Sequence, residues 1–599
     1  MFKSLKRELN GVLHSKQRSI FFSWTLLLIF GGLLPIILVM MPRMIVSYVE
    51  TNKTNDQLTN LILIMGSLVI LFSAINTYVD TKITAKTMTF RINEFVNYYR
   101  IYLNVPYENM ENAKWLDNAQ RQKQALSGDG DGYQGTLDTI SKLLPIVLTA
   151  IIYSVLLAIV SPFILITIVI FVAVSYISEN KARNYEYKKR NEAEHIRRRE
   201  QYFSKTATDF TYTKDIKVFN LKGKILSMLK NEINSFKKIR KQIEAHIFLW
   251  SILESISMAL LLGLTLYFAL DNYNKDNKIS NLVLAILVVI NLIPVLTSAV
   301  TYYSTLLKNL KEVKEYYEYI DENNKEEKVL EKIDINDALE IEFKDVSFKY
   351  PNTDKYIFKN LSFKINKEEK VAIVGINGAG KSTIVKLILG FFKPTSGEIL
   401  INGYNINDFN RKDLYKLYGV VFQDVNVYAF SVLENISMKQ TDESDREKAI
   451  DCLKHVGVYD VIDKLPHKEN QTMLKHLDPE GVELSGGQTQ KLAIARALYK
   501  ENTRCIILDE PTAALDALAE ADIYQSFKEL VTNKTAIYIS HRLSSTKFCD
   551  RIMLFDETGL CEVGNHEELM NLKGKYFEMF EIQGKYYREA SHEELMGDI

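Results

Sequence analysis

The sequence has little cysteine and no excess of either charge. Its 599 residues include four cysteines, none in the CxxC or Cys/His spacing of a zinc site or in a disulfide framework. We expect free thiols in a reducing compartment. Lysine plus arginine equals aspartate plus glutamate, at 74 each, so the net charge is zero. Because nucleic-acid binding usually exploits a broad positive field, we expect no nucleic-acid partner.

Long apolar runs are abundant, but only in the N-terminal half. Six of them are close to the ~20 residues that a membrane-spanning helix requires. The first is too long for a removable signal peptide and lacks a small-residue cleavage site. The sequence predicts a polytopic α-helical membrane domain over residues 1–310, in contact with a lipid bilayer. Its six predicted spans are residues 19–48, 59–80, 140–160, 163–179, 246–270 and 281–305.

The flanks of these runs predict their orientation. Basic residues are frequent in 3–18, before the first run, and in 181–200, after the fourth, whereas the short connections on the other side carry few. Because basic loops stay in the cytoplasm, we expect both termini to be cytoplasmic. The expected location is a bacterial plasma membrane, crossed several times.

Two long connections on the basic side, 81–139 and 180–245, are charged and mostly free of Gly/Pro clusters. We interpret them as helices that continue beyond the bilayer; the alternative is soluble inserts. Near their middles, 106–120 and 211–226 are short amphipathic or turn-bearing segments, placed to touch whatever lies below the membrane.

After a linker at 311–337, short β-branched runs alternate with helical ones over 338–585, before a tail at 586–599. This alternation predicts an α/β domain with a largely parallel sheet. Its run VAIV precedes G-x-x-x-x-G-K-[ST], in which backbone N–H groups, a helix dipole and Lys381 hold phosphates while Ser382 ligates Mg²⁺. The candidate nucleotide-binding residues here are Gly375, Asn377, Gly378, Ala379, Gly380, Lys381, Ser382 and Thr383.

A second apolar run, CIILDE, predicts a strand with two acids at its carboxyl end, where α/β sheets bind ligands. Asp509 suits the magnesium shell and Glu510 suits polarising an attacking water. Without the phosphate loop, the same acids would be read as solvated side chains at a strand end.

A third motif, LSGGQ, opens a predicted helix and offers another hydroxyl and amide site for phosphate. Because the first loop already holds one end of a nucleotide, the second site suggests a nucleotide held by another copy. Its candidate residues are Ser485, Gly486, Gly487 and Gln488.

In this order the motifs resemble the nucleotide-binding domain of the ATP-binding cassette (ABC) family, a P-loop ABC ATPase, over essentially all of 338–585. The resemblance implies ATP and Mg²⁺ as cofactors. It assigns Tyr350 to adenine stacking, Gln423 to the Q-loop and the metal, and His541 to the switch histidine. Glu510 and His541 would act in catalysis with Gln423. Ala513–Asp516 would be the D-loop.

Six spans followed by one cassette resemble the half-transporters of the ABC exporter class. The resemblance implies ATP hydrolysis coupled to alternating access, with 106–120 and 211–226 as coupling segments, one usually docking on the partner's cassette. We expect a homodimer, because Glu510, Ser485–Gln488 and His541 are intact; a heterodimer with this chain as the competent half is the alternative.

Substrate is less constrained. The sequences of several motifs are similar to those of bacterial exporters of lanthipeptides and other modified peptides. The short, cysteine-free N-terminal extension predicts no cysteine-protease domain. Peptide export is therefore the first hypothesis; a multidrug or lipid exporter or flippase, and a non-transport channel or sensor, are the alternatives. Glu254, inside the fifth apolar run, either faces a partner or cationic substrate group or is solvated near the span's end.

Overall fold

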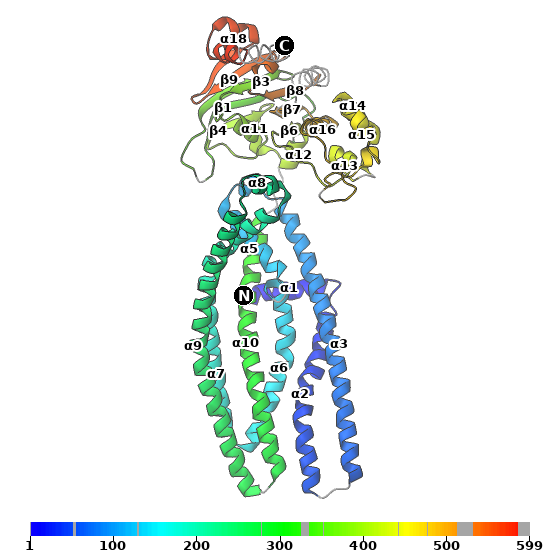
Figure 1. The fold of residues 1–599 in the computed structure, drawn as a ribbon, viewed down its shortest axis with the longest axis vertical. Helices are drawn as coiled ribbons and strands as arrows, with labels where there is room; N and C mark the ends of the chain where they lie inside the picture. Colours follow the sequence, from blue (N-terminus) through cyan, green and yellow to red (C-terminus); the bar gives the residue numbers. More distant parts are fainter. Residues whose placement is uncertain are drawn as a thin grey trace. The chain divides into compact units, whose positions relative to one another are not determined.

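The computed structural model describes the chain in segments separated by short gaps. They are residues 2–51, 55–128, 131–276, 278–324, 333, 335–351, 353–440, 443–475, 477–511 and 531–584. The chain forms two compact units. One comprises Met1–Val105 and Asp117–Asn324, and the other Pro106–Leu116 and Lys325–Ile599. Figure 1 shows long helices in the first unit and strands in the second.

The first unit is built from long helices joined by short turns (Figure 1). Six helices of the described segments are long and apolar enough to cross a membrane, which confirms the predicted number of spans. The helices are α1 (Phe2–His14), α2 (Ile20–Glu50), α3 (Asn55–Tyr102), α5 (Ala113–Ser127), α6 (Gly132–Val160), α7 (Phe163–Thr208), α8 (Thr213–Val218), α9 (Lys222–Asp276) and α10 (Ile279–Asn323), with a 3₁₀ turn at Phe210–Tyr212.

These helices run well past their apolar stretches. α7 continues from the apolar run at 163–179 to Thr208, and α9 begins at Lys222, before its own apolar run. The long charged connections are therefore helical extensions rather than soluble inserts. Both predicted turn-bearing segments are present, as α4 (Tyr107–Met110) with the start of α5, and as the 3₁₀ turn with α8.

Two boundaries differ from the predicted domains. α10 extends without a break to Asn323, so residues 311–323, expected in the linker, are helical. Residues 106–116 group with the second unit rather than with the helices that precede and follow them. The predicted tail at 586–599 lies outside the described residues.

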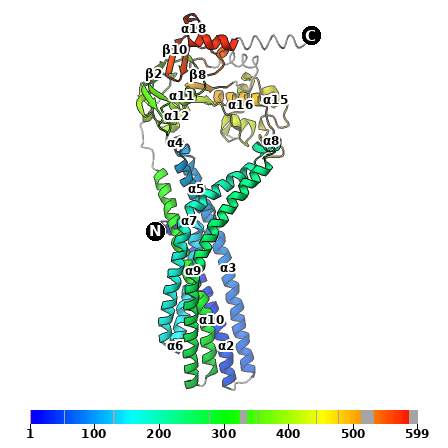
Figure 2. The same cartoon turned by 60° about the vertical axis from the view of Figure 1, so that its left-hand side comes forward.

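Helices α7 and α9 lie side by side, as do α6 and α10 (Figure 2). Large side chains such as Tyr153, Phe171 and Leu261 are at most 1% exposed in a common core. Tyr153 donates its hydroxyl to the carbonyl oxygen of Pro35 at 2.7 Å. Such side-chain donors stabilise the helix carbonyls around a proline, which itself has no N–H to donate.

The N-terminal helix α1 is tied to the end of α10. Arg7 forms an ion pair with Asp321 at 2.8 Å, and its guanidinium lies 4.2 Å from the centre of the Tyr317 ring. A planar guanidinium can satisfy both contacts at once. Arg7 is one of the basic residues in 3–18 that predict the orientation of the spans. Through these two contacts it also holds α1 in place.

The second unit contains two sheets. A four-stranded antiparallel sheet has the order β2-β1-β4-β5, and a six-stranded sheet has the order β10-β9-β3-β8-β7-β6. The strands are β1 (Ile341–Phe348), β2 (Phe358–Ile365), β3 (Lys370–Gly375), β4 (Ser396–Ile401), β5 (Tyr404–Asn405), β6 (Tyr418–Val421), β7 (Cys505–Asp509), β8 (Thr535–Ile539), β9 (Arg551–Asp556) and β10 (Gly559–Gly564).

Five strands of the larger sheet, β6 to β9 and β3, are parallel, and only β10 is antiparallel. The largely parallel sheet is therefore confirmed. The first β-branched run of the predicted α/β domain, LEIEFKDVSFKY at 339–350, instead contains β1 of the antiparallel sheet, which pairs with β2 and β4. Its alternation of apolar and polar residues matches one buried face.

Helices and 3₁₀ turns flank these sheets, and two hydrophobic cores lie against them. Ile373 and Val374 on β3 are fully buried, and because successive side chains alternate, they enter different cores. The helices are α11 (Lys381–Ile388), α12 (Arg411–Lys416), α13 (Val432–Ser437), α14 (Arg446–His455), α15 (Tyr459–Asp463), α16 (Gly486–Tyr499) and α18 (His566–Leu572).

Candidate functional site

The loop between β3 and α11 is a tight backbone turn closed by a buried lysine. Lys381 is 7% exposed and donates through Nζ to the carbonyl oxygens of Gly375 at 2.9 Å and Ile376 at 3.1 Å. Burial lowers the pKa of Lys381 below its usual value, against the opposing effect of Glu510 and Asp509. The lysine is thus positioned over the loop backbone, where it can exchange carbonyl oxygens for phosphate oxygens.

Glycine is required at the start of this loop. Gly375 has φ of +152°, and a Cβ there would lie 2.0 Å from the carbonyl oxygen of Phe555 on the neighbouring strand β9. Asn377 and Gly378 at the tip are exposed, while Ala379 is buried beneath them. The predicted cradle is therefore a loop whose tip faces solvent and whose base is held by the sheet.

Asp509 ends β7 beside the first turn of α11. The nearby Ser382 hydroxyl acts to lower the pKa of its carboxyl group. The Asp509 oxygen Oδ1 is buried and has no hydrogen-bond partner among the described residues. Burial raises the pKa of Asp509 to about 6, with the charges of Glu510 and Asp424 adding to the effect. A buried carboxylate oxygen without a donor costs free energy unless a cation or proton meets it.

This arrangement fits Mg²⁺. The described residues contain no cluster of three or more His, Cys, Asp or Glu that could hold a metal alone. Mg²⁺ in nucleotide sites usually takes one or two protein ligands and fills its shell with phosphates and water. Asp509 and the exposed Ser382 side chain supply such a pair.

Glu510 lies at the centre of the three predicted catalytic residues. Gln423 donates through Nε2 to Glu510 Oε2 at 2.9 Å, and His541 Nδ1 lies 3.4 Å from Glu510 Oε1. The three residues follow strands β6, β7 and β8, which are neighbours in the sheet. Because parallel strands end at one edge, residues far apart in sequence meet there.

Tyr350 lies against the same helix that carries the P-loop lysine. Its hydroxyl is 2.9 Å from Thr383 Oγ1, and its ring meets Phe392 edge-on, with centres 5.3 Å apart. Lys386 Nζ lies 5.3 Å from the ring centre. The Thr383 hydroxyl and the Lys386 ammonium group thus hold Tyr350 at the P-loop helix. The sequence did not predict these two partners.

The LSGGQ motif forms the start of α16. Ser485 caps the helix: its Oγ accepts from the Gln488 N–H, and Gln488 Oε1 accepts from the Ser485 N–H at 2.9 Å. Ser485 and Gly486 are exposed. The motif therefore presents a capped helix start on the surface of its unit. The predicted D-loop residues Ala513–Asp516 lie outside the described residues.

The first predicted coupling segment packs on the nucleotide unit of its own chain. Tyr107 stacks on Phe391 with ring centres 4.5 Å apart and an interplanar angle of 17°. Glu111 forms an ion pair with Lys386 at 2.8 Å. Sequence reasoning missed these contacts; the only signal was a lysine on the P-loop helix followed by the pair Phe391–Phe392.

The second predicted coupling segment belongs to the helical unit. At the end of α8, within this segment, Val218 is 76% exposed and Phe219 is 69% exposed. Two large apolar side chains at a helix tip favour a protein contact over water.

Residues 358–513 match the family whose model is described as ABC transporter. This part of the chain is therefore similar to the domain that the model describes. Among curated proteins, it is 38% identical over 243 residues to an "ATP-dependent lipid A-core flippase" of Pasteurella multocida, 41% of each chain. It is 35% identical over 260 residues to "Subtilin transport ATP-binding protein SpaT" of Bacillus subtilis, 42% of each chain.

Another relative is "Multidrug resistance protein 4" of Entamoeba histolytica, 39% identical over 241 residues, which are 40% of this chain and 18% of that one. The chain thus spans less than half the length of these relatives. Among solved structures, it resembles a bacterial Atm1-family ABC exporter with ATP bound, with a TM-score of 0.75 and 21% identity over 95% of this chain and 99% of the other. The whole chain therefore has the ABC exporter fold.

Proposed function

We propose that this chain is one half of an ATP-driven exporter that hydrolyses ATP with Mg²⁺ and moves its substrate by alternating access. The observation that carries the proposal is the convergence of Gln423 and His541 on Glu510, in a chain that also has six helices able to span a membrane. The exporter fold supports the pairing of these two parts.

In this proposal each site residue has a defined task. Lys381 and the loop backbone bind the β- and γ-phosphates. Asp509 and Ser382 hold Mg²⁺, which when bound neutralises charge on the phosphates. Glu510 accepts a proton from the attacking water, while Gln423 and His541 orient its carboxylate. The contacts at 2.9 and 3.4 Å support these orienting roles.

We infer that two copies form the working assembly, with Ser485–Gln488 of one copy completing the phosphate site of the other. The exposed, capped start of α16 supports this arrangement, because it leaves backbone N–H groups and a hydroxyl on the surface. The exposed Val218 and Phe219 offer a contact for a second cassette. A homodimer remains the proposal over a heterodimer because every predicted catalytic residue is present.

We propose a peptide, modified or not, as the substrate, with export from the cytoplasm across a bacterial plasma membrane. One curated relative is named for subtilin transport, which supports this choice. Another is named as a lipid A-core flippase, so a lipid or amphiphilic drug is the second candidate.

The deciding test is ATPase activity in lipid nanodiscs, titrated with peptides and with lipophilic drugs. Glu510→Gln should lower turnover at least about 100-fold, because general-base catalysis contributes that much, while ATP binding persists. A matched control is Glu501→Gln, since Glu501 is an exposed glutamate of the same domain paired with Lys448. Unchanged turnover in Glu510→Gln would show that Glu510 is not the general base. Equal modulation of ATPase activity by all amphiphiles would favour a drug or lipid exporter.

A further inference from the structure

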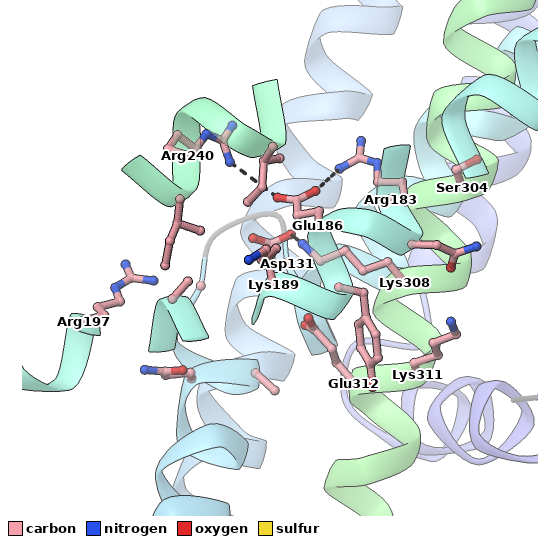
Figure 3. A pocket seen from close by; sticks show the side chains of 18 of the residues that line it. Asp131, Arg183, Glu186, Lys189, Arg197, Arg240, Ser304, Lys308, Lys311 and Glu312 are labelled. Atoms are coloured by element: carbon pink, nitrogen blue, oxygen red, sulfur yellow. Dashed lines mark hydrogen bonds and ion pairs between the residues drawn. The ribbon is translucent and has the colours of Figure 1, made fainter. Parts of the chain in front are cut away.

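A cavity of about 600 Å³ lies within the helical unit. Its walls come from the end of α5 and the turn after it, from α7, from α9 and from α10 (Figure 3). This volume is in the range of pockets that hold small ligands. Of its lining residues only Ser304 falls within a predicted membrane run, and none falls in a nucleotide motif.

The lining is positively charged. It contains six basic side chains, Arg183, Lys189, Arg197, Arg240, Lys308 and Lys311, and three acidic ones, Asp131, Glu186 and Glu312. Among the lining residues the excess is three positive charges, and three acids just outside the lining, Glu179, Glu192 and Glu244, pair with Arg183, Lys189 and Arg240. A concave site lined by one sign of charge concentrates ligands of the other sign.

Two of the acids are already engaged within the cavity. Glu186 lies 3.6 Å from Arg183 and 3.5 Å from Arg240, and Figure 3 shows it between these two side chains. Asp131 pairs with Lys308 at 3.0 Å. These pairs fix basic groups from three helices at the cavity wall.

Lys189 and Lys311 bring further charge from two helices. Lys311 Nζ lies 5.2 Å from the centre of the Tyr187 ring. Lys189 pairs with Glu192 at 2.8 Å, which is its only acidic partner among the described contacts and lies outside the lining. An ammonium held over a ring or by one carboxylate keeps further N–H donors. Both lysines can therefore donate to an anion in the cavity.

Another part of the wall is apolar. Phe236, Ile239 and Ile243 follow one face of α9, and Leu307 joins them from α10. Ile239 and Ile243 are each only 5% exposed. A ligand that combines an anionic group with an aromatic or aliphatic group would satisfy both kinds of wall.

The cavity begins where the membrane run of α7 ends. Its α7 residues extend from Asn180 to Gln201, directly after the apolar run at 163–179. At about 1.5 Å per helical residue, this is roughly 30 Å of helix. Most of the cavity is therefore beyond the hydrocarbon layer, where a water-soluble ligand can enter.

We propose that this cavity is the receiving site for the exported solute, and that the solute carries several carboxylates or phosphates next to an apolar group. The inference rests on the proposed export function, because it assigns the cavity to the substrate. An acidic peptide segment with an aromatic residue has this chemistry.

The test measures binding to the full chain in phosphatidylcholine nanodiscs without nucleotide, by fluorescence anisotropy. The probes are dansyl-Phe-Glu-Glu-Glu and its Gln and Lys counterparts. The acidic probe should bind at least about tenfold more tightly than the neutral one and lose affinity in high salt, because the Debye length shrinks to about 3 Å at 1 M. Equal affinity for the three probes would overturn the proposal.

Matched variants locate the site. Lys189→Gln with Lys311→Gln should weaken binding of the acidic probe about five- to tenfold, as expected for two exposed charge contacts. The control pair is Lys188→Gln with Lys314→Gln, on the same helices but outside the lining, and it should change affinity less than twofold. Equal losses in both pairs would show that general surface charge binds the probe.

Lipid composition separates a soluble solute from a lipid head group. At a fixed salt concentration at which the probe still binds, adding phosphatidylglycerol should change the affinity of the acidic probe less than threefold. Displacement of the probe by this lipid would show that the cavity binds a lipid head group instead. Glu510→Gln should bind the probe normally, since no hydrolysis is involved. Charge-selective binding without ATP-driven uptake into inverted vesicles would support the anion-binding cavity but contradict the proposed export function. Uptake without charge-selective binding would support export but contradict the proposed cavity.

Discussion

Single residues at the sheet edge show unusual geometry. Glu510 has φ of +49°, in the left-handed region that non-glycine residues seldom adopt. Its N–H donates to the carbonyl oxygen of Ile539 at 3.0 Å, which holds the backbone in this conformation. The carboxylate is thereby turned toward Gln423 and His541. Such strain is typical of functional positions.

At the same scale, the raised pKa of Asp509 predicts a pH-dependent metal affinity. With a pKa of about 6, above the usual value near 3.9, the carboxyl is protonated below pH 6 and must lose its proton when Mg²⁺ binds. The affinity for Mg²⁺ in the presence of a non-hydrolysable ATP analogue should therefore fall up to about tenfold as pH drops from 6 to 5. It should level off above pH 7.

The measurement is a Mg²⁺ titration followed by calorimetry at several pH values. Asp509→Asn is the control, because an amide cannot titrate in this range; it should bind Mg²⁺ more weakly at every pH with a flat profile. A sloping profile in Asp509→Asn, equal to that of the native chain, would assign the proton to another group.

At the scale of elements, α11 joins the phosphate loop to the first predicted coupling segment. Lys381 and Ser382 stand in its first turn, and Lys386 lies about one turn later. Lys386 contacts Glu111 of the coupling segment as well as the Tyr350 ring. A movement of the coupling segment can thus reach the P-loop helix through one ion pair and one stack, Tyr107 on Phe391.

This contact predicts a specific coupling defect. Glu111→Gln removes the ion pair with Lys386 but leaves the stack of Tyr107, so basal ATPase activity should stay within about twofold. Substrate stimulation should fall about two- to fivefold, which is the worth of a partly exposed ion pair. ATPase assays with and without substrate measure both.

Glu108→Gln is the matched control for this change, because Glu108 lies in the same short helix. It should behave like the native chain. Full stimulation in Glu111→Gln would show that the ion pair does not transmit the signal, whereas partial rescue by exchanging Glu111 and Lys386 for each other would support it.

At the scale of the whole molecule, the proposed dimer would share each nucleotide site between two copies. A chain with Lys381→Ala and another with Gly486→Asp should each fail to trap nucleotide as homodimers, since every shared site then has one damaged side. A mixed dimer restores one intact site. In a Glu510→Gln background it should retain roughly one ATP per dimer after dilution, by simple counting of intact sites.

Two affinity tags allow the mixed dimer to be purified, and bound nucleotide is counted by chromatography after denaturation. The two homodimeric parents are the controls. If the mixed dimer retains no more nucleotide than its parents, the sites are not shared in the proposed way.

The sequence determined those features that depend on order and composition. The six spans follow from uninterrupted apolar length, and the phosphate loop follows from glycine, lysine and serine at fixed spacing after a strand. The places of Lys381, Asp509 and Glu510 were predictable for the same reason, because Lys381 closes the loop after one recognisable strand and the two acids stand at the end of another. Residues 358–513, which contain these three residues, match the ABC transporter family model.

Only the tertiary structure decided which distant residues meet. Glu111 and Lys386, 275 positions apart, form an ion pair, and no periodicity in either segment predicts the other. The antiparallel pairing of β1 and the basic cavity between helices have the same origin. Local sequence sets the elements through backbone and burial preferences, but the packing of those elements chooses the neighbours, because it depends on all of their faces at once.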